Sequence, residues 1–225
     1  MRRPGRRRGL SWYERIFNRK RPKPPRQSKP KSNTVLKTTL SKYDPTMLKQ
    51  LQQVRKYSRI IKDVARRYSY LETSIICGIG SRESHWGLAL KPAGPGGRGD
   101  FARRRPRGDR RTAEPSDGGG YGRGLMQIDY DWHEFARTGR WQDPRENLMY
   151  ACIVIDNARK FFKREGLRLN DEQLLHAVIA AYNGGATATM NAIKAGKDID
   201  ANTTGRDYGR DVLNRTAWFQ LHGWK

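Results

Sequence analysis

The apolar stretch between residues 71 and 84 constrains the fold most, because few of its side chains can face water. Its centre, residues 75–79, holds three isoleucines, one cysteine and one glycine, which is typical of a helix buried on nearly all sides. The stretch ends beside Glu83, and Trp86 follows three residues later. A carboxyl group at the edge of a core loses hydration, which raises its pKa. Glu83 is therefore predicted to keep a proton near neutral pH, as a general acid must.

The first part of the chain is strongly basic. Residues 1–32 hold 13 Lys or Arg against a single acid, Glu14, and so supply half of the formal net charge of +24 carried by the 225 residues. This Pro- and Ser-rich sequence cannot bury enough apolar surface to offset the entropy lost on ordering, so residues 1–40 are predicted to be a disordered arm. Such a charge implies a polyanionic partner: nucleic acid, anionic lipid or bacterial wall.

Helix start signals recur through the rest of the chain. Asp44-Pro45 and Asp143-Pro144 each combine an N-cap residue with a proline suited to the first turn, and Asn170 opens a further apolar stretch. Residues 88–121 are instead rich in Gly, Pro and Arg without periodicity, and are predicted to be a long loop with room for short strands. Residues 41–225 are therefore predicted to form one mainly α domain.

Several classes of protein are not indicated. No run of about 18 apolar residues is present, so no membrane-spanning helix is expected. The charged N-terminus is not followed by the apolar segment of an export signal, which leaves the compartment open. Cys77 and Cys152 lie in apolar stretches and are expected to be reduced core residues, with a disulfide as the alternative. The four histidines are scattered, and neither a cofactor nor a metal site is expected.

Three motifs occur in a fixed order. They are Arg82-Glu83-Ser84-His85, Gly124-Leu125-Met126-Gln127-Ile128-Asp129 and Ala181-Tyr182-Asn183, and Asp207-Tyr208 follows near the C-terminus. Each is common by chance, but together they resemble the goose-type lysozyme family, within the lytic transglycosylase clan. The resemblance covers about residues 45–223. It implies an α+β lysozyme-like fold and a monomeric enzyme without a cofactor that acts on peptidoglycan glycan strands.

The resemblance also implies roles for three carboxylates. Glu83 matches the family's general acid, and Asp129 matches a carboxylate that positions water. Asp117 matches the second such carboxylate, with a spacing to Asp129 that is one residue longer than usual. Each has a plainer alternative: Glu83 paired with Arg82 at a helix end, Asp129 as an N-cap, and Asp117 as a turn residue before Gly118.

The same resemblance places five further residues in the substrate cleft: Gln127, His133, Tyr182, Asn183 and Tyr208. His133 is equally typical of a satisfied surface or core histidine, and Asn183 of a helix C-terminus. The basic insert of residues 88–117 departs from the family's pattern. It is expected to reshape the cleft or to contact the wall polymer.

Geometry decides which reaction is expected. Glu83 would protonate the glycosidic oxygen between N-acetylmuramic acid and N-acetylglucosamine. If Asp129 or Asp117 lies about 6.5–9.5 Å away on the opposite face, a water fits between the carboxyl groups and hydrolysis inverts the anomer. Otherwise the muramic 6-hydroxyl attacks and gives the anhydro product of a lytic transglycosylase. The presence of Asp129 favours hydrolysis.

Two readings without catalysis remain from the charge alone. One is a nucleic-acid-binding protein, although the chain shows no recognition-helix, zinc-finger or RNP signature. The other is a cationic wall-binding or structural protein with an inactive lysozyme-like fold, against which the presence of Glu83 argues. In the enzymatic reading too, the basic arm is expected to anchor the protein to the anionic surface of the bacterial cell wall, which is then the site of action.

Overall fold

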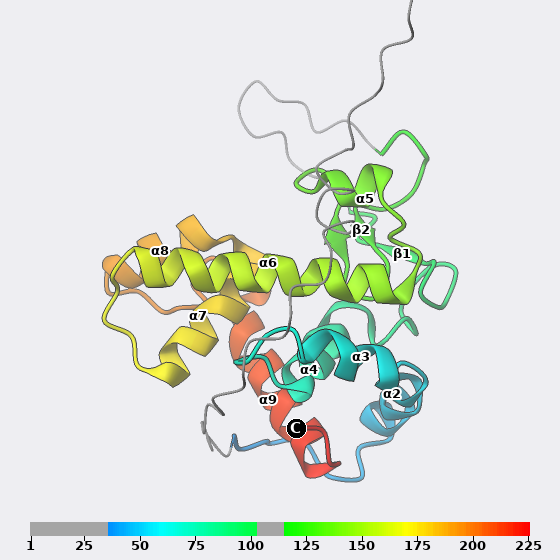
Figure 1. Ribbon diagram of the computed structural model, residues 1–225, viewed down its shortest axis with the longest axis horizontal. Coiled ribbons are helices and arrows are strands. Elements are labelled where there is room, and N and C mark those ends of the chain that lie inside the picture. Colours follow the sequence, from blue (N-terminus) through cyan, green and yellow to red (C-terminus); the bar gives the residue numbers. More distant parts are fainter. Residues whose placement is uncertain (1–35, 103–114) are drawn as a thin grey trace, which may run out of the picture.

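The computed structural model describes residues 36–102 and 115–225, which form a mainly helical domain (Figure 1). The described elements are α2 (Pro45–Lys56), α3 (Ser58–Ala65), α4 (Thr73–Ser84), β1 (Arg98–Gly99), β2 (Gly122–Arg123), β3 (Ile128–Asp129), α5 (Glu134–Thr138), α6 (Pro144–Arg164), α7 (Asp171–Gly184), α8 (Ala186–Lys194), the 3-10 turn η1 (Thr204–Arg206) and α9 (Tyr208–Leu221). The expectation of a mainly α fold with minor strand is confirmed. Most of the predicted basic arm, and residues 103–114 of the basic insert, lie outside the described residues.

Three helices begin where the sequence predicts. At the start of α2 the Asp44 carboxylate accepts a hydrogen bond from the backbone N–H of Met47 (2.8 Å). Asp143 accepts from two backbone N–H groups in the first turn of α6. Asn170 and Gln173 form a reciprocal capping box at α7. These caps satisfy backbone donors that have no partner within the helix, which is why the local sequence predicts them.

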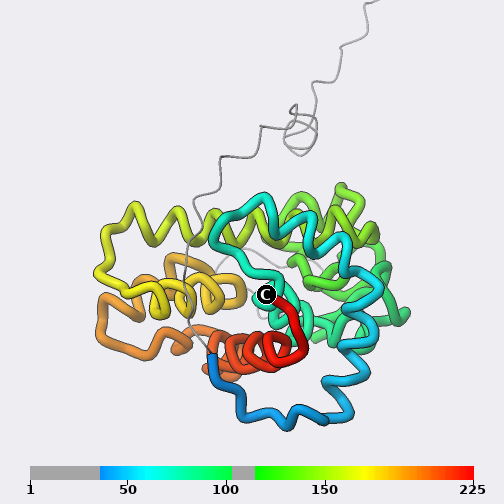
Figure 2. The backbone as a smooth tube through the Cα atoms, turned by 60° about the horizontal axis from the view of Figure 1, so that its bottom comes forward, coloured from blue at the N-terminus to red at the C-terminus, as the bar shows by residue number. Residues whose placement is uncertain are grey.

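The long helix α6 sets the layout of the domain. It spans the width of the molecule in both views (Figures 1 and 2). The small sheet and α5 lie toward its N-terminal end, whereas α7 and α8 lie toward its C-terminal end. Helix α7 packs against α6, α8 and α9, and α9 packs against α4. These helices therefore form one connected core.

The apolar helix α4 lies in the interior beside α9. All of its residues from 73 to 81 are buried, as the sequence predicts. Gly78 allows the two helices to approach closely. A Cβ atom at this position would lie 2.4 Å from Thr216 Oγ1 and 2.8 Å from the Val212 carbonyl oxygen. A side chain here would therefore push α4 away from α9.

The three strands form one antiparallel sheet in the order β1-β2-β3. Gly99 of β1 pairs with Gly122 of β2, and Gly122 pairs with Asp129 of β3. This row joins residues on either side of the basic insert. It therefore brings the end of β1 next to the motif that carries Asp129.

The turn between β2 and β3 is held by three helices. The Ser84 hydroxyl, at the end of α4, donates to the Leu125 carbonyl oxygen (2.6 Å). Asn147 of α6 accepts from the Met126 N–H (2.9 Å), and the Tyr182 hydroxyl of α7 donates to the Met126 carbonyl oxygen (2.7 Å). Leu125 and Met126 are themselves fully buried. The turn therefore fixes the sheet relative to the C-terminal end of α4.

We expect Asn147→Ala to lower the free energy of unfolding by about 2–6 kcal/mol. The buried Asn147 side chain accepts from Met126 N and donates to the Arg123 carbonyl oxygen (3.1 Å). Its loss leaves two buried backbone groups without their partner, each at about 1–3 kcal/mol. Urea unfolding measures the change. The control is Asn191→Ala, at an exposed position of α8, with an expected effect within about 0.5 kcal/mol. Equal effects of the two variants would contradict the role of Asn147.

Candidate functional site

Glu83 lies in the last turn of α4, where the buried helix reaches the surface. Its side chain is partly exposed, and its Oε1 accepts a hydrogen bond from the hydroxyl of Tyr208. Tyr208 is the first residue of α9 and is itself buried. The contact between α4 and α9 thus sets where the carboxyl group points.

The pKa of Glu83 is raised from its ordinary value of 4.5 to about 7. Desolvation by burial is the largest cause. The hydrogen bond from Tyr208 and the positive charge of Arg82 act in the opposite direction, while the negative charge of Asp100 raises the pKa further. The carboxyl group therefore keeps its proton up to about neutral pH, as expected for an acid at the edge of the core.

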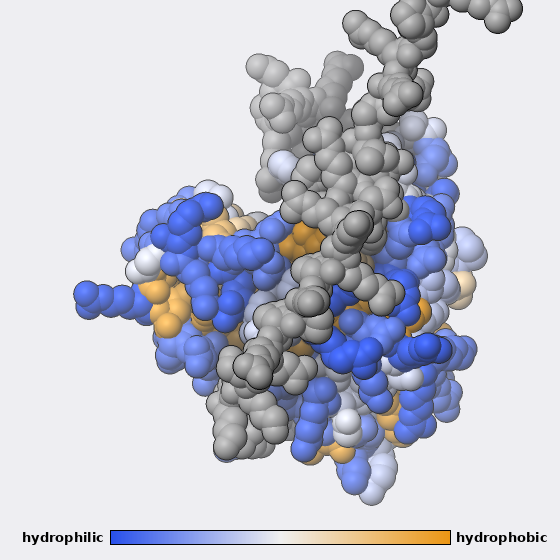
Figure 3. All heavy atoms as spheres, viewed as in Figure 1, coloured by the Kyte–Doolittle hydropathy of each residue, from blue (hydrophilic) through white to orange (hydrophobic). Residues whose placement is uncertain are grey.

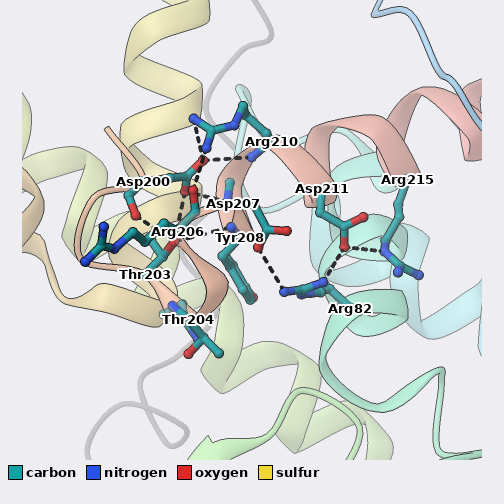
Figure 4. Close-up of polar contacts among 12 residues, drawn as sticks. Arg82, Asp200, Thr203, Thr204, Arg206, Asp207, Tyr208, Arg210, Asp211 and Arg215 are labelled. Carbon is teal, nitrogen blue, oxygen red and sulfur yellow. Dashed lines mark hydrogen bonds and ion pairs between the residues drawn. The ribbon is translucent and has the colours of Figure 1, made fainter. Parts of the chain in front are cut away.

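Arg82 is held by two carboxylates of the α9 segment (Figure 4). Its Nη1 lies 3.0 Å from Asp211 Oδ2, and its Nη2 lies 3.2 Å from Asp207 Oδ1. Asp211 also accepts from Arg215 Nε (2.7 Å). The guanidinium group lies 5.9 Å from the centre of the Tyr208 ring. Arg82 is thus fixed beside the acid by α9. The ion pair of Arg82 is made with these aspartates and not with Glu83.

A second polar cluster anchors the start of α9, also in Figure 4. The buried Asp200 carboxylate accepts from the backbone N–H groups of Gly209 (2.7 Å) and Arg210 (3.1 Å). It also lies 2.8 Å from His176 Nε2 of α7. An anion at a helix N-terminus satisfies free donors and complements the helix dipole. Asp200 therefore fixes the helix end that carries Tyr208.

The predicted cleft residues of α7 join the same region. The Tyr182 hydroxyl is bonded to the sheet turn at Met126, and burial followed by the charge of Glu83 raises the pKa of Tyr182. The Asn183 Oδ1 accepts from the backbone N–H of Thr204 (2.7 Å). Asn183 therefore joins the end of α7 to the loop before Tyr208, a bond that agrees with the helix-end alternative.

Asp129 and His133 lie between β3 and α5. Asp129 Oδ1 accepts from the backbone N–H groups of Asp131 (2.8 Å) and Trp132 (3.3 Å). His133, not Asp129, is the residue that precedes the first turn of α5. The His133 Nδ1 lies 3.2 Å from the Tyr150 hydroxyl, and burial lowers the pKa of the imidazole. Asp129 thus shapes the turn at the sheet edge, and His133 is half-buried behind it.

Gln127 covers one face of the sheet. A Cβ atom added at Gly99 or at Gly122 would come within 2.3 Å or 2.1 Å of Gln127 Oε1, so the two bare glycines make room for this side chain. Its Nε2 donates to the Gly124 carbonyl oxygen (2.9 Å). The Gln127 amide therefore lies against Gly99 and Gly122, which belong to the same row of paired residues as Asp129.

Asp117 is engaged by two arginines. Its Oδ1 accepts from Arg123 Nη2 (2.9 Å), and its Oδ2 lies 3.3 Å from Arg98. Burial acts to raise the pKa of Asp117. The hydrogen bonds from Arg123 and Gly119 and the two guanidinium charges outweigh burial, so the net effect lowers the pKa. Because Arg123 is fully buried, Asp117 neutralises a cation that water cannot reach. The bond from Gly119 N (3.1 Å) is the turn contact that the sequence offers as an alternative.

Asp100 is a carboxylate that sequence reasoning missed. It directly follows β1 with a φ of +52°, in the left-handed region that Asp tolerates better than most residues. Its negative charge contributes to the raised pKa of Glu83. Through the row Gly99–Gly122–Asp129, the preceding residue lies two strand spacings, about 10 Å, from Asp129. The signal in the sequence was the glycine-rich stretch 96–99 before Asp100, but the basic insert separates it from the motif.

In the ranges 36–102 and 115–225, no three His, Cys, Asp or Glu gather in a way that could hold a metal ion. No helix among these described residues is long and apolar enough to cross a bilayer. Cys77 and Cys152 are both buried and free, which confirms the expectation of reduced core residues.

Comparison with known proteins identifies relatives over most of the chain. A family model described as Lysozyme g matches residues 46–223. Lysozyme g of Casuarius casuarius is 32% identical over 174 residues, which are 77% of this chain and 78% of that protein. Lysozyme g of Gallus gallus is 31% identical over 176 residues, 78% and 69% of the two chains. Lysozyme g of Cyprinus carpio is 29% identical over 174 residues, 77% and 78%.

We expect Glu83→Gln to stabilise the domain above neutral pH and to have little effect in acid. The unfolded chain releases the Glu83 proton from about pH 4.5 upward, whereas the folded state keeps it until about pH 7. The free energy of unfolding of the parent therefore falls across this interval, by about 2–3 kcal/mol for a partly exposed group. The variant has no proton to release. Urea unfolding of both proteins between pH 4 and pH 8 measures the difference, and a difference independent of pH would contradict the raised pKa.

Proposed function

Because the chain belongs to the lysozyme g family, we propose that Glu83 is the general acid with which it cleaves peptidoglycan. The enzyme is a glycosidase of the muramidase type, which cuts the β-1,4 bond between N-acetylmuramic acid and N-acetylglucosamine. The assignment rests on the pKa of the Glu83 carboxyl group, which burial raises to about 7 at the point where α4 reaches the surface.

The proposed first step is transfer of the Glu83 proton to the glycosidic oxygen. Tyr208 holds Oε1 of Glu83 and so orients the carboxyl group toward its substrate. After the transfer Glu83 is an anion, which the hydrogen bond from Tyr208 and the nearby charge of Arg82 stabilise. Burial thus favours the protonated carboxyl group before the step, and Tyr208 and Arg82 lower the free-energy cost of losing the proton.

The proposed second step is attack by a water molecule that carboxylates on the sheet hold. Asp129 has the motif position, and the negative charge of Asp100 acts on the pKa of Glu83. Inverting glycosidases keep their two carboxyl groups about 6.5–9.5 Å apart so that a water fits between them. Catalysis by Asp117 remains a prediction from the sequence. Its contacts with Arg98 and Arg123 support a role in anchoring the sheet edge instead.

The cleft in this proposal is built from one chain, and we propose that the enzyme acts as a monomer. Tyr182 and Tyr208 surround the acid from α7 and α9. Gln127 and His133 line the sheet side, on either side of Asp129. Asn183 contributes by holding the loop before Tyr208. The glycan strand would lie across these residues, between the sheet and the C-terminal helices.

We expect Glu83→Gln to lose nearly all activity, at least about 100-fold, because a general acid contributes about 10²–10⁴-fold. Asp129→Asn keeps an oxygen for the turn at Trp132 but removes the charge, so it tests water activation without unfolding the turn. Asp100→Asn tests the second carboxylate in the same way. Both are expected to slow hydrolysis more than Asp117→Asn does. The assay is release of soluble fragments from purified peptidoglycan.

Mass spectrometry of the released muropeptides separates the two reactions. Reducing ends identify the hydrolase, and anhydro ends identify a lytic transglycosylase. A rise in the share of anhydro ends in Asp129→Asn or Asp100→Asn would support their role in holding water. Unchanged rates in both would refute it, and substantial turnover by Glu83→Gln would refute the acid.

The basic arm is proposed to bind the anionic wall surface. Half of the net charge lies in residues 1–32, and the described surface beyond them is also largely hydrophilic on the face shown in Figure 3. The described chain is already attached to the domain at Thr38, whose hydroxyl donates to Asn214 Oδ1 of α9 (2.9 Å). The arm is therefore joined to the catalytic domain next to α9, and residues 1–35 can be removed without cutting this contact.

We expect removal of residues 1–35 to weaken binding to intact walls at low salt, with little change in cleavage of short soluble glycans. The Debye length falls from about 10 Å at 0.1 M to about 3 Å at 1 M salt, so the difference from the full chain should shrink as salt rises. A full-length variant with the arm's Lys and Arg replaced by Gln is the control for length. Equal wall binding by all three proteins at low salt would rule out the anchor.

A further inference from the structure

Two aromatic side chains stay exposed beside the proposed water-positioning carboxylates. Trp132 is 66% exposed and follows Asp129 by three residues, and Phe101 is 54% exposed and directly follows Asp100. Most other large apolar side chains of the described residues are buried in the core. An exposed tryptophan leaves a large apolar surface in water, which is uncommon unless a partner covers it.

The backbone that presents Trp132 is fixed. Its N–H donates to Asp129 Oδ1 (3.3 Å), and the next N–H, of His133, donates to the Asp129 carbonyl oxygen (3.1 Å). Arg137 of α5 donates to the Asp131 carbonyl oxygen in the same turn (3.2 Å). The indole is therefore carried by a turn that is bonded at both ends. Ordering such a side chain on a ligand costs less entropy than ordering a mobile loop.

The register of the sheet places the segments that carry both aromatics at one end of the sheet. Gly99 pairs with Gly122 and Gly122 pairs with Asp129, so the residues that follow Gly99 and Asp129 leave the two outer strands at the same end of the sheet. The backbones of Gly99 and Asp129 are about 10 Å apart, two strand spacings. Near Phe101, the Lys91 ammonium lies 5.8 Å from the ring centre. This end of the sheet thus carries two exposed apolar rings and a positive charge.

We infer that Trp132, with Phe101 at the same end of the sheet, forms a stacking platform for pyranose rings of the glycan strand. Pyranose rings carry axial C–H groups on one face, and an aromatic ring buries that face while the hydroxyl groups at the rim stay in water. The Lys91 charge suits a muramic acid residue whose lactyl carboxylate carries no stem peptide. The inference rests on the proposed function, because the same strand must reach Glu83. It adds a binding subsite to the proposed site.

The test is glycan binding in the Glu83→Gln background, which prevents turnover. Short soluble glycan chains with free lactyl carboxylates are titrated calorimetrically. Trp132→Ala should weaken binding about tenfold, the loss expected for a buried tryptophan contact. Trp132→Tyr keeps a ring and should recover most of the affinity. Tyr43→Ala is the matched control, because Tyr43 is an aromatic side chain exposed by 76% just before α2.

A second readout uses the active protein. Trp132→Ala should raise KM about tenfold and change kcat less than about twofold, with thermal unfolding unchanged, because the side chain packs little against the domain. Binding and KM equal to those of the parent would overturn the platform. Failure of the proposed function has a different signature: retained cleavage by Glu83→Gln would overturn the acid, whereas the binding of Trp132→Ala would still decide the platform.

Discussion

The site depends on how the turn between β2 and β3 is held. Ser84, Asn147 and Tyr182 come from three different helices and converge on the backbone of Leu125 and Met126. These bonds are buried, where an unpaired backbone group is costly, so the turn has one favourable position. The sheet has only short strands of its own and takes its place from this turn. The distance between the acid on α4 and the carboxylates on the sheet is therefore a property of helix packing.

Opposing effects on the pKa of Glu83 set its chemistry. Burial alone would leave a carboxyl group that rarely gives up its proton. The hydroxyl of Tyr208 and the charge of Arg82 bring the pKa back to about 7. Both are positioned by α9, Arg82 through Asp207 and Asp211. The last helix of the chain thus tunes an acid that lies more than a hundred residues earlier in the sequence.

Local patterns predicted a large part of this arrangement. The helix starts at Asp44, Asp143 and Asn170 and the burial of α4 follow from short-range signals, since caps and periodicity act within a few residues. Glu83 was found because its apolar surroundings are adjacent in sequence. Asp100 was missed because its relation to Asp129 arises from strand pairing across the basic insert, and motif spacing carries no information about that register.

The two buried cysteines make local unfolding of this enzyme detectable by thiol labelling. Both thiols are shielded from solvent, and burial raises their pKa, so neither reacts while the core is closed. Cys77 lies on the same helix as the acid, and Cys152 lies on α6. A thiol reagent would therefore label Cys77 only when α4 loosens from its neighbours, which is also the event that displaces Glu83. Labelling of Cys77 therefore reports the same local unfolding that would abolish catalysis.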